Sequence, residues 1–256
     1  MSLPFSSRRK VCEARLIKEG FKPIFIDAID LRDKSIDDLK DKFDFENFKS
    51  SHGVFPSVGE VGCALSHLRA YEKIAKKKLK DKYFFIAEDD CLPLVNAKEI
   101  LEIINSLKGL SPDVVLLGYS KVDDHIYKAI QRSNPIKKLA NVSGSKRLIG
   151  RKYTETTCGA VAYLVSQRFI KKLSKMDRPR VVADDWLYYK SEMNATILHV
   201  SPLCFLEDFN SMKSNLEDFR SVKFAKKYKR IRIPRFIRPF WQHFVGLGRR
   251  LLMELT

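Results

Sequence analysis

Residues 83–87 form a continuous apolar run, Tyr-Phe-Phe-Ile-Ala, which leads directly into an acidic triplet, Glu88, Asp89 and Asp90. An apolar run without alternation is typical of a strand covered on both faces, and such strands occur in α/β sheets. Three adjacent carboxylates repel one another, so burying them at the end of a strand requires a cation or fixed hydrogen-bond donors. The sequence therefore constrains both the fold class and the chemistry at the end of this strand.

The acidic triplet predicts a site for a metal ion and phosphate groups. Ligands of open α/β sheets bind beyond the carboxyl ends of the strands. Mg²⁺ and Mn²⁺ prefer carboxylate oxygen and are commonly shared between one or two carboxylates and the phosphates of a substrate. The alternative is a solvated acidic turn. Against that alternative stands the apolar strand, which places the acids at the sheet.

Helical and strand patterns alternate along the chain and predict an α/β layered domain. Ser6 or Ser7 can cap a helix that reaches about Glu19 and ends at Gly20. Further helices are expected at residues 59–80, 97–107, 166–174 and 184–193, with a short helix and loop within 30–49. Strands are expected at residues 23–28, 83–87, 113–118, 160–165 and 195–200, and the polar stretch 119–157 predicts a hairpin or active-site loops.

The positive charge is concentrated in the last part of the chain. The 256 residues carry a formal net charge of +17, and residues 220–256 alone hold 11 Lys and Arg against the single acid Glu254. We therefore expect a domain at residues 1–215 and a basic C-terminal tail at residues 216–256. The tail also contains Trp241, Phe244 and other apolar residues, which is typical of a segment that lies on an anionic membrane surface. A packed helix with a solvated basic face is the plainer alternative, and nucleic-acid binding, for which no motif is present, is not expected.

The apolar runs and the cysteines show which other classes of protein are not expected, namely membrane-spanning, secreted and zinc-binding proteins. No apolar stretch approaches the roughly 20 residues that a membrane-spanning helix needs, and the N-terminus lacks the apolar core of a secretory signal. The cysteines, Cys12, Cys63, Cys91, Cys158 and Cys204, are odd in number and form no Cys-x-x-Cys pair. We therefore expect reduced thiols in a cytoplasmic protein, and no zinc site.

Several blocks resemble glycosyltransferase family 25, which includes the bacterial lipooligosaccharide galactosyltransferases. The most specific block is the Gly-Glu-Val-Gly-Cys-Ala-Leu-Ser-His-Leu-Arg-Ala segment at residues 59–70, together with the acidic triplet. The other blocks are residues 2–4 with Arg8 and Arg9, residues 25–30, residues 159–166 and residues 184–186. The resemblance covers about residues 2–205. Family members usually have several apolar residues before the Ser-Leu-Pro turn, whereas this chain begins at that turn, so we expect a truncated start or a very short first strand.

The resemblance implies a GT-A type nucleotide-sugar fold, a Rossmann-like mixed sheet flanked by helices. It also implies inverting transfer from a UDP-sugar, with UDP-galactose favoured and a β-1,4 linkage expected. In this family pattern Asp90 would ligate Mn²⁺ (or Mg²⁺) bridging the diphosphate, Glu88 would act through water, and Asp89 would lie near the ribose. His199 matches a position that supplies a second metal ligand in such folds, with a core histidine as the equal alternative.

The resemblance also assigns roles around the reaction. Inversion needs a base for the acceptor hydroxyl, and Asp185 is expected to be that base, with Asp184 second. Trp186 would stack on the acceptor sugar, whereas the alternative role of the two aspartates is to cap the following helix. The residues expected to contact the donor are Arg8, Arg9, Asp27, Ser66, His67, Glu88, Asp89 and Gly159.

The expected partners follow from these assignments. They are a UDP-sugar donor, a lipid-linked oligosaccharide acceptor of lipooligosaccharide or lipopolysaccharide, and the anionic inner membrane, which the tail would contact from the cytoplasmic side. One alternative is a UDP-glucose-dependent transferase of the same fold. The other is a catalytically inactive basic protein that binds membranes or nucleic acid.

Overall fold

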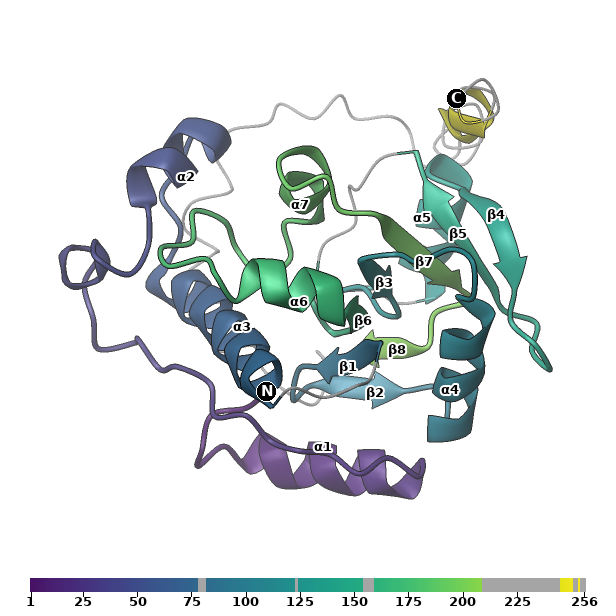
Figure 1. Ribbon diagram of the computed structural model, residues 1–256, viewed down its shortest axis with the longest axis horizontal. Helices are drawn as coiled ribbons and strands as arrows, with labels where there is room; N and C mark the ends of the chain where they lie inside the picture. The colour runs from purple at the N-terminus through teal and green to yellow at the C-terminus, as the bar shows by residue number, and fades with distance from the viewer. Residues whose placement is uncertain (78–81, 123, 154–158, 209–244, 251–252, 254–256) are drawn as a thin grey trace.

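The computed structural model describes residues 1–77, 82–122, 124–153, 159–208, 245–250 and 253. Figure 1 shows a central sheet with helices packed around it. The helices are α1 (Ser7–Lys18), the 3₁₀ helix η1 (Asp37–Leu39), α2 (Phe45–His52), α3 (Val58–Lys76), α4 (Ala97–Ser106), α5 (Asp124–Ser133), α6 (Gln167–Leu173) and α7 (Trp186–Ser191). The strands are β1 (Tyr83–Ala87), β2 (Cys91–Pro93), β3 (Val114–Leu116), β4 (Ile136–Asn141), β5 (Leu148–Lys152), β6 (Ala162–Ser166), β7 (Ile197–Ser201) and β8 (Phe205–Glu207).

The described strands form a mixed sheet of six strands and a separate pair. The six-stranded order is β1-β6-β3-β7-β5-β4, and β2 pairs with β8. Only β3 and β7 run parallel; the other paired strands are antiparallel. The predicted mixed α/β architecture is confirmed at this level. β1 occupies one edge of the sheet, so the chain that follows it is not enclosed by strands on both sides.

Helices cover both faces of this sheet, as the apolar strands predict. Along β3, Val114 and Leu116 pack in one core cluster with residues of α3, α6 and α7. Val115 and Leu117 point the other way, into a second cluster with residues of α1 and α4. Every residue of β6 and β7 is buried. A third, smaller cluster joins Phe43, Phe45 and neighbouring residues to the start of α3.

Local capping explains where the helices that carry site residues begin. The Ser6 hydroxyl accepts a hydrogen bond from the Arg8 backbone N–H at 3.2 Å, and the left-handed Gly20 (φ 78°) follows the end of α1. Ser57 and Glu60 form a capping box at the start of α3. The predicted cap of α1 by Ser6 is confirmed, and so is the helix expected at residues 166–174, which is α6 with Ser166 as its N-cap.

Four segments differ from the sequence prediction, namely residues 23–28, α5, β2 and β8. Residues 23–28 were expected to form a strand, but they make only an isolated parallel bridge between Ser2 and Asp27. The Ser2 backbone supplies just two hydrogen bonds there, to residues 26 and 28, which is too little pairing for a strand. Within residues 119–157 the expected hairpin is present as β4 and β5, whereas α5 and the short strands β2 and β8 were not predicted.

Most of the predicted tail, including residues 216–244, lies outside the described residues. Residues 245–250 are helical and lie against the end of α5. Gly246 sits so close to the Arg132 carbonyl that a Cβ would overlap it, and an Arg249 guanidinium nitrogen donates to the Ser133 carbonyl at 2.6 Å. None of the described helices is both long and apolar enough to cross a membrane.

Candidate functional site

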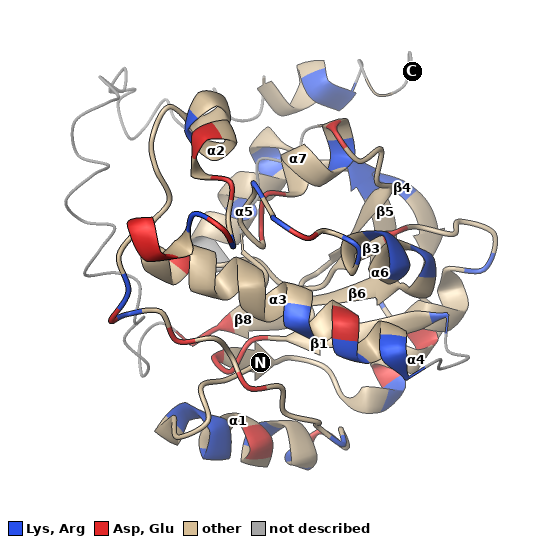
Figure 2. Ribbon diagram, turned by 60° about the vertical axis from the view of Figure 1, so that its left-hand side comes forward, with Lys and Arg blue, Asp and Glu red and all other residues tan. Residues whose placement is uncertain are grey.

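The acidic triplet directly follows β1, at the edge of the sheet. An Arg8 guanidinium nitrogen from α1 lies 2.7 Å from Asp90 Oδ2, and the other terminal nitrogen lies 3.4 Å from Asp89 Oδ1. The Ser2 hydroxyl donates to Asp89 Oδ2 at 2.6 Å. Figure 2 shows acidic segments gathered between the N-terminus, α1 and β8. The N-terminal segment and α1 therefore supply the donors that face Asp89 and Asp90.

These donors do not balance the negative charge of the triplet. Burial, and then the charge of Glu88, raise the pKa of Asp90 to about 7. Burial, and then the charge of Asp184, raise the pKa of Glu88 to about 7. Asp90 Oδ1 is buried and has no hydrogen-bond partner among the described residues. A hard divalent cation would offset both the burial and the repulsion, so the donor set fits Mn²⁺ or Mg²⁺.

Two residues of α3, one helical turn apart, contact Glu88. The Cys63 thiol lies 3.7 Å from Glu88 Oε1, and His67 Nε2 lies 3.5 Å from the same oxygen. His67 Nδ1 lies 2.7 Å from the Tyr163 hydroxyl, which is 2.6 Å from the Tyr71 hydroxyl. Burial lowers the pKa of His67 to about 3, so its imidazole is neutral at physiological pH. His67 thus links Glu88 to a buried pair of tyrosines.

Ser66, the neighbour of His67, has main-chain partners on both sides. Its hydroxyl donates to the Gly62 carbonyl at 2.6 Å and accepts from the Ile29 backbone N–H at 2.8 Å. The residue is 3% exposed. In the structure Ser66 therefore links α3 to the segment after Asp27 by hydrogen bonds. Its expected contact with the donor stays a prediction.

Of the two arginines expected at the diphosphate, only Arg8 lies on the acidic triplet. Arg9 instead pairs with Asp27 at 2.6 Å and stacks its guanidinium over the Phe25 ring, 4.9 Å from the centroid. The hydrogen bond from Arg9 lowers the pKa of Asp27 below its ordinary value. The Asp27 side chain is 54% exposed. Arg9 and Asp27 were both expected to contact the donor. In the structure they pair with each other, next to the β-bridge between Ser2 and Asp27.

The two aspartates before α7 are engaged in different ways. Asp185 Oδ1 caps α7 by accepting from the Tyr188 backbone N–H at 3.0 Å, and its Oδ2 lies 2.8 Å from His52 Nε2. Asp184 Oδ2 accepts from the Gly159 backbone N–H at 2.8 Å. Both the base and the cap therefore remain compatible with Asp185, because one of its oxygens faces a half-exposed histidine.

Gly159 and Trp186 lie beside these aspartates, in the interior. Gly159 has φ 102°, and a Cβ on it would overlap Ser120, so this position requires glycine. Its carbonyl accepts from the Trp186 indole N–H at 3.2 Å. Trp186 is 2% exposed and packs edge-on against Tyr163, with 5.3 Å between ring centroids. The expected stacking of Trp186 on a sugar would require the indole to leave this core.

His199 lies on β7, where it is fully buried. Its Nδ1 is 2.9 Å from the Tyr119 hydroxyl. Among the described residues, the group of three potential metal ligands that converges contains neither His199 nor Asp90. The placement of His199 is that of the core histidine that the sequence leaves as its alternative, and its role as a second metal ligand stays a prediction.

Sequence reasoning did not single out Cys63, Tyr163 or His52. The spacing of Cys63 and His67 at i and i+4 on a helix would have indicated that both lie on one face of α3. His52 and Asp185 are 133 positions apart, so no local pattern relates them. Contacts of this kind depend on how α2 and α7 pack.

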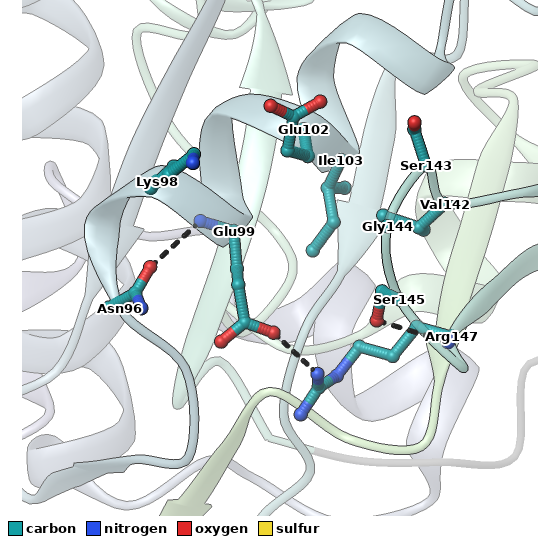
Figure 3. Close-up of a pocket in the computed structure, with 10 residues that line it drawn as sticks. All are labelled: Asn96, Lys98, Glu99, Glu102, Ile103, Val142, Ser143, Gly144, Ser145 and Arg147. Atoms are coloured by element: carbon teal, nitrogen blue, oxygen red, sulfur yellow. Dashed lines mark hydrogen bonds and ion pairs between the residues drawn. The ribbon is translucent and has the colours of Figure 1, made fainter.

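A pocket of about 280 Å³ lies elsewhere, between α4 and the turn that joins β4 to β5. Figure 3 shows the Glu99 carboxylate pointing across this pocket to Arg147, with 2.8 Å between the paired atoms. None of the residues expected at the active site lines the pocket. The acidic triplet therefore lies outside this pocket.

The comparison with protein-family models agrees with the resemblance seen in the sequence. The family model described as glycosyltransferase family 25 (LPS biosynthesis protein) matches residues 1–188. No curated protein matches the chain. A solved structure titled crystal structure of A197 from STIV is 14% identical, covers 64% of this chain and 76% of that chain, and superposes with a TM-score of 0.33. The family match supports a glycosyltransferase role, with a sugar donor and an acceptor. Because the match spans well over half of its length, the chain belongs to glycosyltransferase family 25.

Proposed function

We propose that the protein is an inverting, metal-dependent transferase of GT-A type. It would move galactose from UDP-galactose to a lipooligosaccharide or lipopolysaccharide outer-core glycan, forming a β-1,4 linkage. The observation that carries the proposal is the under-neutralised acidic triplet after β1, where Asp90 Oδ1 is buried without a partner among the described residues. A nucleotide diphosphate bound with a divalent cation would complete such a site.

Asp90 is the residue proposed to hold Mn²⁺ (or Mg²⁺), with Glu88 acting through water and Asp89 near the ribose. When bound, the metal would offset charge on the departing diphosphate. Arg8 adds a fixed positive charge at the same place, since its guanidinium already lies 2.7 Å from Asp90 Oδ2. His199 is proposed as the second ligand, a role that requires the imidazole to separate from the Tyr119 hydroxyl.

Asp185 is proposed as the base of the reaction. The acceptor oxygen forms a bond to the anomeric carbon while the bond from that carbon to UDP breaks, and the acceptor proton passes to the Asp185 carboxylate. His52, 2.8 Å from Asp185 Oδ2, would orient that oxygen. Asp184 is the second candidate, although its Oδ2 already accepts from the Gly159 backbone N–H.

The basic tail supports a position at the cytoplasmic face of the inner membrane, where a lipid-linked acceptor would be found. Residues 220–256 carry a net charge of +10, counting 11 basic residues and one acid. Each Lys or Arg near an anionic surface adds about 1 kcal/mol of attraction. Deleting residues 220–256 should release the enzyme from anionic vesicles without abolishing transfer to a soluble acceptor. Loss of all activity on the soluble acceptor would instead show that the tail is structural.

The function is tested by UDP release with Mn²⁺, using UDP-galactose and UDP-glucose in parallel and lactose- or glucose-terminated acceptors. The variants are the wild type, Asp90→Ala and the control Asp33→Ala, whose side chain is 78% exposed. Metal-dependent turnover of UDP-galactose that is lost only in Asp90→Ala supports the proposal. Turnover of UDP-glucose alone supports the alternative donor. No turnover and no UDP binding would contradict the proposal and favour an inactive basic binding protein.

A further inference from the structure

A second group of potential metal ligands adjoins the acidic triplet. It consists of the Cys63 thiol, the His67 imidazole and the Glu88 carboxylate, whose ligand atoms all lie within 4.8 Å of one another. Cys63 and His67 come from successive turns of α3, and Glu88 follows β1. We propose that these three side chains bind Zn²⁺. This site adjoins the Asp90 site through Glu88 but does not include Asp90, and the inference does not depend on the proposed glycosyl transfer.

The two distances to the Glu88 carboxylate match a tetrahedral zinc site. With ordinary Zn–N, Zn–O and Zn–S bonds, two ligands of a tetrahedral ion are separated by about 3.4 Å for nitrogen and oxygen and about 3.6 Å for sulfur and oxygen. His67 Nε2 and Glu88 Oε1 are 3.5 Å apart, and Cys63 Sγ and Glu88 Oε1 are 3.7 Å apart. The nitrogen–oxygen separation is long for a hydrogen bond. Two of the three separations therefore match those of ligands of one ion, and all three ligand atoms lie within 4.8 Å of one another.

The state of His67 is the second observation that points to a ligand. Its side chain is 2% exposed, and Nε2 is buried with no hydrogen-bond partner among the described residues, although it faces Glu88. With its proton on Nδ1, the ring donates to the Tyr163 hydroxyl at 2.7 Å, and that hydroxyl can donate to Tyr71 at 2.6 Å. Metal-binding histidines commonly use the second nitrogen in this way, which leaves the Nε2 lone pair available.

The chemistry of the ligands selects zinc over the cation expected at Asp90. Mg²⁺ and Mn²⁺ prefer oxygen, whereas a thiolate with an imidazole suits Zn²⁺. Binding would replace the Cys63 thiol proton, which is released to solvent, with a Zn–S bond. Glu88 is 25% exposed and gives the ion a route from solvent. Three protein ligands leave the fourth tetrahedral position for water or an anionic ligand.

Cobalt(II) is the probe for this site, because it takes zinc's place and its thiolate complexes absorb in the near-ultraviolet and visible. The full chain, reduced and freed of metal, is titrated with Co²⁺ and then with Zn²⁺. We expect a saturable sulfur-to-cobalt band at one Co²⁺ per chain, and displacement of that band by Zn²⁺. Cys63→Ser and Glu88→Gln should lose the band, and circular dichroism would check that both remain folded.

Two controls separate this site from its neighbours. Cys12→Ser removes a thiol that lies 3.9 Å from the Cys91 sulfur, and it should keep the band. Asp90→Asn should also keep the band, because Asp90 is not one of the three ligands. No band in the wild type would overturn the proposal, as would a band that survives in Cys63→Ser or disappears in Cys12→Ser. Failure of UDP-sugar turnover would leave the cobalt result unaffected, so the two proposals fail separately.

Discussion

The acidic triplet after β1 and the Asp184–Asp185 pair before α7 are satisfied to very different degrees. At the end of β1, burial and then the charge of Asp184 raise the pKa of Glu88 to about 7, and burial and then the charge of Glu88 raise the pKa of Asp90 to about 7; Arg8 is the cation paired with Asp90. Before α7, by contrast, Asp184 and Asp185 each accept a hydrogen bond from a backbone N–H, and Asp185 also meets His52. Adjacent carboxylates therefore do not define a metal site by themselves; the number of donors that the fold supplies distinguishes the two groups.

This difference has a consequence for the proposed chemistry. The acidic triplet has an oxygen left for a cation, which suits a donor site. Asp184 and Asp185 both accept hydrogen bonds that hold the backbone in place. If Asp185 is the base, it must therefore act through Oδ2, the oxygen that contacts His52. Substitutions that preserve the structural role while removing the charge can test each group, with Asp184 as the member of the pair whose charge also acts on Glu88.

Asp90→Asn is expected to have the largest effect. Asparagine keeps the volume of the side chain and removes the charge that would hold the cation, so turnover of the UDP-sugar should fall to background. The melting temperature should change little, because the loss of the Arg8 ion pair is countered by relief of repulsion with Glu88. Initial rates and a thermal melt measure both, with Asp33→Asn as the exposed control. Retained turnover in Asp90→Asn would show that the acidic triplet is not the donor site.

Asp185→Asn is expected to lower the turnover number by about 10²–10⁴-fold, the usual contribution of a general base. Asparagine is as good an N-cap as aspartate, so α7 should remain intact. The matched variant Asp184→Asn can still accept the hydrogen bond from Gly159 and should lose less activity. A larger loss in Asp184→Asn would reverse the assignment of the base. Single-turnover rates with saturating donor provide the comparison.

Tyr163→Phe tests the buried network behind the triplet. Removing this hydroxyl leaves His67 Nδ1 and the Tyr71 hydroxyl without the partner they share, and an unsatisfied buried polar group costs about 1–3 kcal/mol. The free energy of unfolding from urea denaturation should fall by that amount. Tyr83→Phe is the control, because its single hydrogen bond to the Pro112 carbonyl is 3.3 Å long and its loss should cost less. Equal losses in both variants would argue against a network.

His52→Ala is expected to have the smallest effect. The His52 and Asp185 side chains are 31% and 17% exposed, and a partly solvated contact of this kind contributes about 0.2–1 kcal/mol to stability. The turnover number should fall much less than in Asp185→Asn, because His52 only orients the carboxylate. Turnover numbers of His52→Ala and Asp185→Asn, measured side by side, test this expectation. An equal fall would mean that His52 itself takes part in the proton transfer.

Elements that depend on local sequence were predicted well. β1 follows from an unbroken apolar run, and α1 and α6 follow from the serines that cap them. Residues 23–28 have strand-like composition but lack a partner strand in the described structure. Composition alone therefore predicted a strand that does not form. α5 was missed because its polar sequence hides the two apolar residues, Tyr127 and Ile130, that pack against the core.

The site was only partly predictable, for a physical reason. The acidic triplet is contiguous in sequence, and its charge alone indicates a cation. The contacts that define its surroundings are long-range: Arg8 reaches Asp90 across 82 positions, and Cys63 reaches Glu88 across 25. The expected contact of Trp186 with the acceptor sugar stays a prediction, and the packing of the indole against Tyr163, which buries it, could not be read from the neighbouring sequence.

The central claim is that Asp90 and its neighbours bind a nucleotide through a divalent cation. Calorimetric titration of UDP into the full chain, with and without Mn²⁺, tests it most directly. The account predicts binding that requires Mn²⁺ in the wild type and is absent in Asp90→Asn, while the control Asp33→Asn binds normally. Binding of equal strength without metal, or in Asp90→Asn, would contradict it.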